Sequence, residues 1–130
     1  MSIERVNPAT VFAMPDLISQ AVSSSGRTLV HLSGQVAWDA DGNLTGPGDH
    51  AVQAAKIAEN ITAVLAAANA TWDDIVKETI YVVDYRPELI PVIFGALRRG
   101  PAPASTLVPV PALFQPGYLI EVEVVAAIEG

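Results

Sequence analysis

The stretch Ile120-Glu121-Val122-Glu123-Val124, near the end of the chain, alternates apolar and acidic residues. In an extended strand, successive side chains point to opposite faces of the sheet. Glu121 and Glu123 would therefore share one face, and the apolar side chains would share the other. An ordinary half-solvated antiparallel strand also alternates in this way. The pattern thus predicts a strand with one buried face and leaves the role of its two acids open.

Three further strands are predicted upstream of this one. One lies near residues 105–109 and begins just after Pro103-Ala104, and another covers residues 79–84. The third covers residues 28–32, is rich in β-forming residues and ends at Ser33-Gly34. The final strand itself is expected near residues 118–127.

Two helices are predicted between these strands. Asp49 offers an N-cap oxygen for a helix that runs to about Asn69. Its polar side is expected to carry Gln53, and its apolar side is formed by residues at helical spacing, which are Ala54, Ile57, Ala58, Ile61, Val64, Leu65 and Ala68. A second helix is expected to start with Pro87 at its first position and to continue through Leu97.

Short polar motifs mark turns between these elements. The pair Asp41-Gly42 predicts a hairpin turn, because both residues tolerate positive φ. Thr71 followed by Asp74 predicts a capping arrangement for a single turn. The resulting order is strand, strand, helix, strand, helix, strand, strand, and it indicates an α+β fold with two helices on one face of a mixed sheet.

Composition limits the classes of function. The 130 residues suit one domain, and the chain is 51% hydrophobic and 16% charged, against about 45 to 50% and 25% in an average domain. We expect some of the apolar excess to cover a subunit interface. The net charge is -7 and the seven basic residues are scattered, so no nucleic-acid surface is expected.

The residue types present also limit the chemistry. The chain has no cysteine, which excludes disulfides, thiolate metal sites and a cysteine nucleophile. His31 and His50 are far apart and have no triad or metal-ligand spacing around them, so neither a metal nor a cofactor is expected. No signal peptide pattern occurs in residues 1–16, and no apolar stretch is long enough to span a bilayer, so a cytoplasmic location is expected.

Three sequence blocks in this order resemble the Rid (YjgF, RidA) family. They are Leu32-Ser33-Gly34-Gln35, the segment from Asp74 to Asp84, and the terminal pair formed by Pro103-Ala104-Ser105-Thr106 and the Glu121 strand. The resemblance runs from about Ser19 to Ala126. It implies a single Rid domain over residues 1–130, with the Rid or chorismate mutase-like α+β fold, assembled as a homotrimer with its clefts between subunits.

The resemblance also implies a site and a reaction. Family members hydrolyse imines, and by this likeness Glu121 would be the catalytic acid that orients water. Backbone groups near Ser33-Gly34 and Leu107 would hold polar ends of the ligand, and the hydroxyls of Ser105 and Thr106 would donate hydrogen bonds to it. Glu123 is expected to be an exposed or interface acid.

The chain departs from the family pattern at the residue that follows Pro103-Ala104. The arginine that binds the carboxylate of a 2-imino acid is replaced by Ser105, and shifting the register to Pro101-Ala102 puts Pro103 in its place. A family cysteine corresponds to Leu107, a tyrosine to about Ile18, and an asparagine to Pro91 or Val92. The pocket is therefore expected to be more apolar, and a 2-imino acid to fit it poorly.

Three functions agree with this reading. The first is a hydrolytic deaminase of imine or enamine metabolites, related to the 2-iminoalkanoate deaminases but with altered substrate preference. The second is a trimer that binds a metabolite or regulates a partner without catalysis. The third is an enzyme that performs another addition or condensation on a neutral substrate. Whether Arg98 or Arg99 replaces the missing cation is open at this point.

Overall fold

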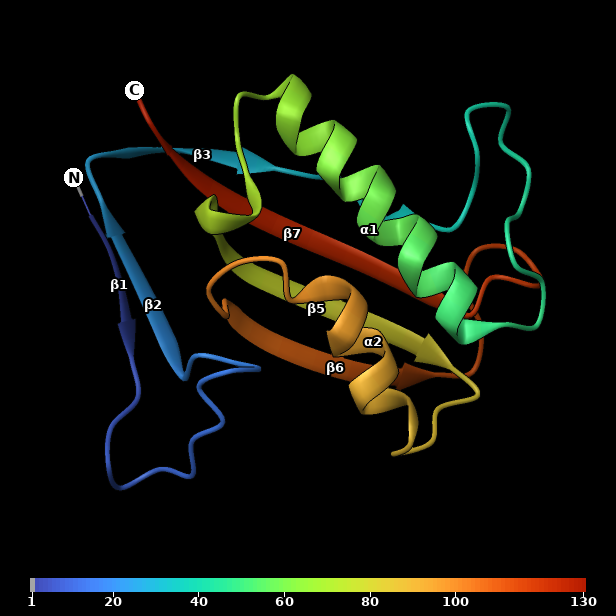
Figure 1. Cartoon of the computed structure of the whole chain (residues 1–130), viewed down its shortest axis with the longest axis horizontal. Helices are drawn as coiled ribbons and strands as arrows, with labels where there is room; N and C mark the ends of the chain where they lie inside the picture. The colour runs from blue at the N-terminus through green and yellow to red at the C-terminus, as the bar shows by residue number, and fades with distance from the viewer. Residues whose placement is uncertain (1) are drawn as a thin grey trace.

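The computed structural model describes residues 2–130 and consists of one main sheet, two helices and a separate N-terminal hairpin (Figure 1). The elements in chain order are β1 (Ser2–Val6), β2 (Ala21–Ser25), β3 (Arg27–His31), β4 (Gln35–Val36), α1 (His50–Ala67), a 3₁₀ turn (Trp72–Asp74), β5 (Ile75–Val83), α2 (Leu89–Leu97), β6 (Ala104–Val110) and β7 (Ile120–Glu129). None of the helices within residues 2–130 is long and apolar enough to cross a membrane.

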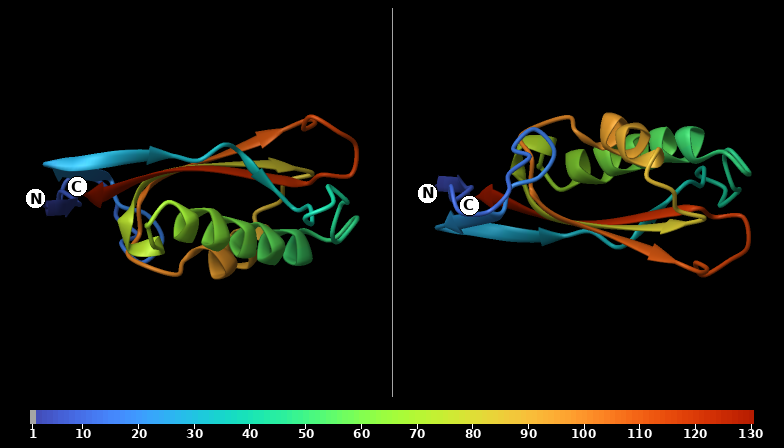
Figure 2. Two further views of the ribbon diagram at one scale, coloured as in Figure 1. Left: turned by 90° about the horizontal axis from the view of Figure 1, so that it is seen from above. Right: turned by 90° about the horizontal axis from the view of Figure 1, so that it is seen from below.

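The main sheet is mixed. Its strands are ordered β3-β7-β5-β6, and β4 pairs with the other end of β7. β5 runs parallel to β6 and antiparallel to β7. Both helices lie on the same face of this sheet, and the opposite face is left uncovered (Figure 2). The predicted α+β class, with two helices on one face of a mixed sheet, is confirmed.

The core lies between the helices and the sheet. The apolar stripe of α1 contributes Ile57, Ile61 and Leu65, which are almost completely buried. The sheet contributes the alternate residues of β5 and β7 that point toward the helices, including Ile80 and Val122. The apolar face predicted for the strands by their alternation therefore packs against the apolar face predicted for α1 by its helical spacing.

The predicted caps and turns are present. Asp49 is the N-cap of α1, and its carboxylate accepts a hydrogen bond from the backbone N–H of Val52 at 3.0 Å. Thr71 and Asp74 form a capping box around the 3₁₀ turn. Gly42 has a φ of 82° in the turn after Asp39, as the hairpin prediction required.

Gln53 differs from the prediction that it lies on the exposed side of α1. Its side chain is fully buried. Its amide donates to the carbonyls of Gly46 and Gly117 at 3.1 and 2.9 Å and accepts from the N–H of Leu119 at 2.8 Å. Because all of its polar atoms are hydrogen-bonded, the amide is stable at a buried position and ties α1 to the loop before β7.

Several boundaries and one pair of strands also differ from the predictions, and β5 begins at Ile75 rather than at residue 79. α2 begins at Leu89 rather than at Pro87, because Pro87 and Glu88 form tighter turns with bonds from Leu89 to Arg86 and from Ile90 to Pro87. β7 begins at Ile120 rather than near residue 118, since the N–H of Leu119 is bonded to Gln53. The N-terminal hairpin of β1 and β2 was not predicted.

Candidate functional site

Glu121 lies on the uncovered face of the sheet, beside the end of the Ser33-Gly34 segment. In the sheet, Glu121 is opposite Tyr81 of β5 on one side and Val36 of β4 on the other. The carboxylate occupies the space that a side chain at residue 34 would fill, because a Cβ atom built on Gly34 would lie 1.9 Å from Oε2 of Glu121. Gly34 therefore permits a close approach that no other residue type would allow.

The surroundings of Glu121 disfavour its charged form. Partial burial removes water from the carboxylate, and the neighbouring charge of Glu123 repels it, so the pKa of Glu121 is raised above its ordinary value. Burial is the larger of the two causes. A carboxyl group with a raised pKa holds a proton more firmly, which suits a group that accepts and returns protons during catalysis.

Glu123 is exposed on the same face, as predicted. The hydroxyl of Tyr81 donates a hydrogen bond of 2.8 Å to Oε1 of Glu123. This bond to the carboxylate, with a smaller effect of burial, raises the pKa of Tyr81. Glu123 thus positions Tyr81 and repels Glu121, while Glu121 itself is the acid that is partly sheltered.

The predicted ligand-binding residues of β6 are divided between the two faces of the sheet. Ser105 is in register with the buried Glu78, so its side chain and that of Leu107 point to the helix-covered face. Thr106 is in register with Thr79 on the uncovered face, where its hydroxyl accepts a hydrogen bond of 3.2 Å from Lys77.

Within one chain, therefore, only part of the predicted site comes together. Ser33 and Gly34 adjoin Glu121. Ser105 and Leu107 lie on the other face of the sheet, and β5 separates their strand from β7. Because their side chains point to opposite faces of the sheet, the two groups belong to different surfaces of the same chain.

An apolar hollow of about 310 Å³ lies on the Leu107 side. Its lining residues are Met14, Leu17, Tyr85, Ile90, Phe94, Leu107 and Pro109. None of them carries a charge. Of this group, the sequence identified only Leu107, because most of the others come from the N-terminal segment, the loop before α2 and α2 itself, and no local pattern connects these segments.

Arg98, which the sequence left open as a source of positive charge for the site, is held in an ion pair. Its guanidinium pairs with both carboxylate oxygens of Glu78, and its Nε donates to the carbonyl of Leu17. The side chains of Arg98 and Glu78 are only 11% and 2% exposed, and the guanidinium also lies 4.6 Å from the ring centroid of Phe94. Arg98 is therefore already neutralised beneath the hollow.

Arg99 is no better placed. Its Nε donates to the carbonyl of Ala96 at 3.0 Å, and its guanidinium lies over the ring of Trp72. Ser105 has a buried hydroxyl oxygen that finds no hydrogen-bond partner within residues 2–130. Neither arginine therefore places an unpaired guanidinium beside the hollow.

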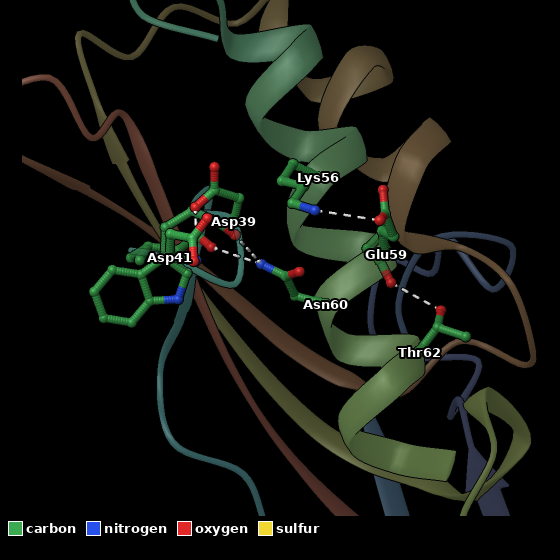
Figure 3. A network of polar contacts seen from close by, with 9 residues as sticks. Asp39, Asp41, Lys56, Glu59, Asn60 and Thr62 are labelled. Atoms are coloured by element: carbon green, nitrogen blue, oxygen red, sulfur yellow. Dashed lines mark hydrogen bonds and ion pairs between the residues drawn. The ribbon is translucent and has the colours of Figure 1, made fainter. Parts of the chain in front are cut away.

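A second cluster of polar side chains, around Asp39 and α1, is structural (Figure 3). The Asp39 carboxylate accepts from the backbone N–H groups of Asp41 and Asn43, and the bond from Asn43 is the main cause that lowers the pKa of Asp39. Asn60 of α1 donates to the carbonyls of Val36 and Trp38. These contacts fix the turn after β4 to the helix.

The two histidines are also placed by the structure. His50 is buried, and its Nε2 lies 2.8 Å from the carbonyl of Val83. His31 is exposed in this chain. Within the described part of the chain, no group of three or more His, Asp or Glu side chains could hold a metal ion.

Comparisons with known proteins agree with the fold and with the sequence blocks. The family model described as Endoribonuclease L-PSP matches residues 16–128. Protein DfrA of Myxococcus xanthus is 32% identical over 109 residues, which are 83% of this chain and 82% of that protein.

Two solved structures from Yersinia pestis are similar over almost the whole chain. The Rid-family protein YyfB superposes with a TM-score of 0.92 at 32% identity, covering 98% of this chain and 100% of that chain. The Rid-family protein YyfA superposes with a TM-score of 0.68 at 29% identity with the same coverage. Both are described as proteins of unknown function.

Proposed function

The chain belongs to the Rid (YjgF) family, and from this premise we propose that it hydrolyses small neutral imines or enamines in a cleft between two copies of the chain. The observation that carries the proposal is the sheltered carboxylate of Glu121, which lies against Gly34 with a raised pKa. Such a group can hold a water molecule and accept its proton.

The proposed cleft forms between copies because its two halves lie on different surfaces of one chain. One copy supplies Glu121 with Ser33 and Gly34, and the next supplies the hollow beside Leu107. An interface that joins two different surfaces is head-to-tail, and it closes into a ring when the rotation between copies allows it. A homotrimer is the smallest such ring beyond a dimer and is the assembly that we propose.

In the proposed reaction, water adds to the carbon of the C=N bond. Glu121 takes one proton from the water as the C–O bond forms and delivers it to the nitrogen, which gives a neutral carbinolamine. The carbinolamine then loses ammonia, or an amine, as the C–N bond breaks and a carbonyl forms. In this second step Glu121 takes the proton of the new hydroxyl and delivers it to the departing nitrogen, so the carboxylate is regenerated.

The hollow supports a neutral substrate. A 2-imino acid would bring a carboxylate next to Leu107 and Phe94, and the guanidinium stacked on Phe94, that of Arg98, is already paired with Glu78. An unpaired charge buried in this way costs several kcal/mol. Substrates with an apolar side chain and no carboxylate avoid that cost.

A non-catalytic trimer that binds a metabolite or regulates a partner is the second candidate. It is favoured by the same hollow, which is lined by apolar groups and offers few polar atoms for chemistry. The two candidates differ in a simple way. A binding protein would retain a neutral ligand without converting it, whether or not Glu121 is intact.

A panel of enzymatically generated imines tests the proposal. Pairs of imines would share a side chain and differ only in a carboxylate, and their decay would be followed with and without the purified protein. We expect the protein to accelerate the decay of the neutral members and to leave the carboxylate-bearing members near their spontaneous rates. Acceleration of neither kind by an assembled protein would favour the binding function.

Gly34→Ala is expected to lower the hydrolysis of neutral imines by about 10²-fold, since displacement of a reacting group by about 1 Å has an effect of this order. The new methyl group would collide with Oε2 of Glu121 and push the carboxylate aside. Gly95→Ala is the matched control, because a Cβ atom at residue 95 meets nothing within 4 Å. Equal rates for the two variants would contradict the proposed role of Gly34.

The pH dependence of the reaction is expected to respond to Glu123. If Glu121 acts as a carboxylate, activity falls as the pH drops through its raised pKa. Glu123→Gln removes the like charge that contributes to this shift, so the acidic limb of kcat/KM should move to lower pH. Tyr81→Phe, which removes the hydrogen bond to Glu123 but keeps its charge, should leave the limb nearly in place.

A further inference from the structure

We propose that the N-terminal hairpin is exchanged between copies, with β2 of one copy pairing antiparallel with the free edge of β3 in the next. This proposal rests on the proposed assembly of copies but not on the proposed chemistry. It names the surface through which the copies join and explains how the two halves of the cleft would come together.

The connection between β2 and β3 does not let them pair with each other. β2 pairs with β1 in a sheet of its own, and β3 forms one end of the main sheet. Gly26 alone separates the two strands, with a φ of 61°. A hairpin needs a loop of at least two residues, so the chain bends at Gly26 and does not reverse.

The segment before β2 is held at the opposite edge of the main sheet. Ser19 forms a parallel bridge with Ala104 at the start of β6, and its hydroxyl donates to the carbonyl of Ala102 at 2.7 Å. Arg98 donates to the carbonyl of Leu17, and Arg5 of β1 donates to the carbonyl of Asp73. β2 therefore crosses the end of the sheet from β6 toward β3 (Figure 1), and the hairpin is fixed away from its own β3 edge.

The edges of β2 and β3 have the least protection, since β2 has no charge and β3 carries one charged residue, Arg27, at its start. Charged residues or proline usually block pairing at exposed strand edges. β1 carries Glu4 and Arg5, and β6 carries Pro109 and is partly covered by Ser19.

By contrast, the sequence of β2 is Ala-Val-Ser-Ser-Ser and contains neither a charge nor a proline. The middle of β3 is Thr-Leu-Val, and Leu29 is 52% exposed. Both strands are five residues long. Two weakly protected edges of equal length on one chain fit each other when two copies meet head to tail.

Antiparallel pairing of these edges would also assemble the cleft. β2 starts at Ala21, shortly after Leu17, which lines the apolar hollow. The end of β3 leads directly into Ser33 and Gly34, which adjoin Glu121. In an antiparallel pair the start of one strand lies beside the end of the other. The hollow of one copy would thus lie next to the Glu121 group of the next.

Cysteine cross-linking tests the exchange in a chain that has no cysteine of its own. If the strand ends are aligned, Ser23 lies opposite Leu29, and directly opposed residues of antiparallel strands lie within disulfide reach. The double variant Ser23→Cys/Leu29→Cys is oxidised, together with Ser25→Cys/Leu29→Cys for a shifted register. We expect the main product to be a reducible covalent multimer that ends at the trimer on a denaturing gel.

Other products would overturn the proposal. An internal disulfide in a monomer would mean that β2 folds back on its own β3. A dimer formed by either single-cysteine variant alone would mean that like edges pair with each other. No cross-link in either register, with the oligomer confirmed by light scattering, would mean that these edges do not meet.

A mixing experiment covers the case in which the double variants fold poorly. Ser23→Cys and Leu29→Cys, carrying different affinity tags, are unfolded, mixed, refolded and oxidised. We expect disulfide-linked pairs that contain both tags, and their absence from refolded oligomers would contradict the exchange. Because the readout is a covalent bond, this test can succeed or fail independently of imine hydrolysis.

Discussion

Glu121→Gln is expected to lower the hydrolysis of neutral imines by about 10²- to 10⁴-fold, the range by which a positioned acid–base group accelerates proton transfer. Glutamine keeps the shape of the side chain against Gly34 but cannot accept a proton from water. The amide also removes the repulsion by Glu123, so no loss of stability should accompany the loss of activity. The measurement is kcat/KM for a neutral imine, corrected for its spontaneous decay.

The control for this variant is Glu123→Gln, which makes the same chemical change two residues along the same face. It should retain most of the activity at neutral pH. Light scattering on both variants should give the mass of the wild-type oligomer. Turnover near the wild-type rate by Glu121→Gln would mean that Glu121 has no role in the mechanism. Ligand binding without turnover in the wild type and in both variants would establish the non-catalytic function.

Arg98→Met is expected to lower the free energy of unfolding by about 3 to 5 kcal/mol, the usual effect of removing one partner from a buried ion pair. The carboxylate of Glu78 is 2% exposed and would lose its bidentate partner. The carbonyl of Leu17 would lose its hydrogen bond to Nε at the same time. The measurement is urea unfolding at a fixed protein concentration, because oligomer stability depends on concentration.

Two further variants test whether loss of the ion pair causes the expected decrease in the free energy of unfolding. The double variant Glu78→Leu/Arg98→Met should recover much of the loss, since a buried pair can often be replaced by apolar residues. Lys56→Met breaks the ion pair with Glu59, whose side chain is 72% exposed, and should cost less than about 1 kcal/mol. An Arg98→Met variant that unfolds no more easily than Lys56→Met would contradict the importance assigned to this pair.

Local sequence patterns predicted most of the main sheet and both helices. The spacing of Ile57, Ile61 and Leu65 and the cap at Asp49 are contained within α1 itself. The alternation in β7 likewise needs no information from elsewhere in the chain. Such features were predictable because neighbouring residues decide them.

Features that depend on distant partners were missed. Gln53 has the polarity of a surface residue, and only its bonds to Gly46, Gly117 and Leu119 explain its burial. β2 is rich in serine and becomes a strand through its pairing with β1.

The candidate site was also predicted only in part. The family resemblance pointed to Glu121 with Gly34, and the structure places them in contact. The apolar lining from Met14 and Phe94 could not be predicted, because no sequence pattern connects these residues to Leu107. The pairing of Arg98 with Glu78 depends on two side chains twenty residues apart, so the sequence left the role of Arg98 open.

Complementation between two inactive variants tests most directly whether the cleft is built from two copies. Glu121→Gln lacks the carboxylate, and Leu107→Trp fills the apolar hollow of its own copy. Each variant alone should be inactive, since every cleft would carry one defect. After the two are unfolded together and refolded as a mixture, about a quarter of the clefts in a head-to-tail ring should combine an intact Glu121 with an intact hollow. We expect this mixture to regain about that fraction of the wild-type rate, and a mixture no more active than the separate variants would mean that the cleft does not join two copies.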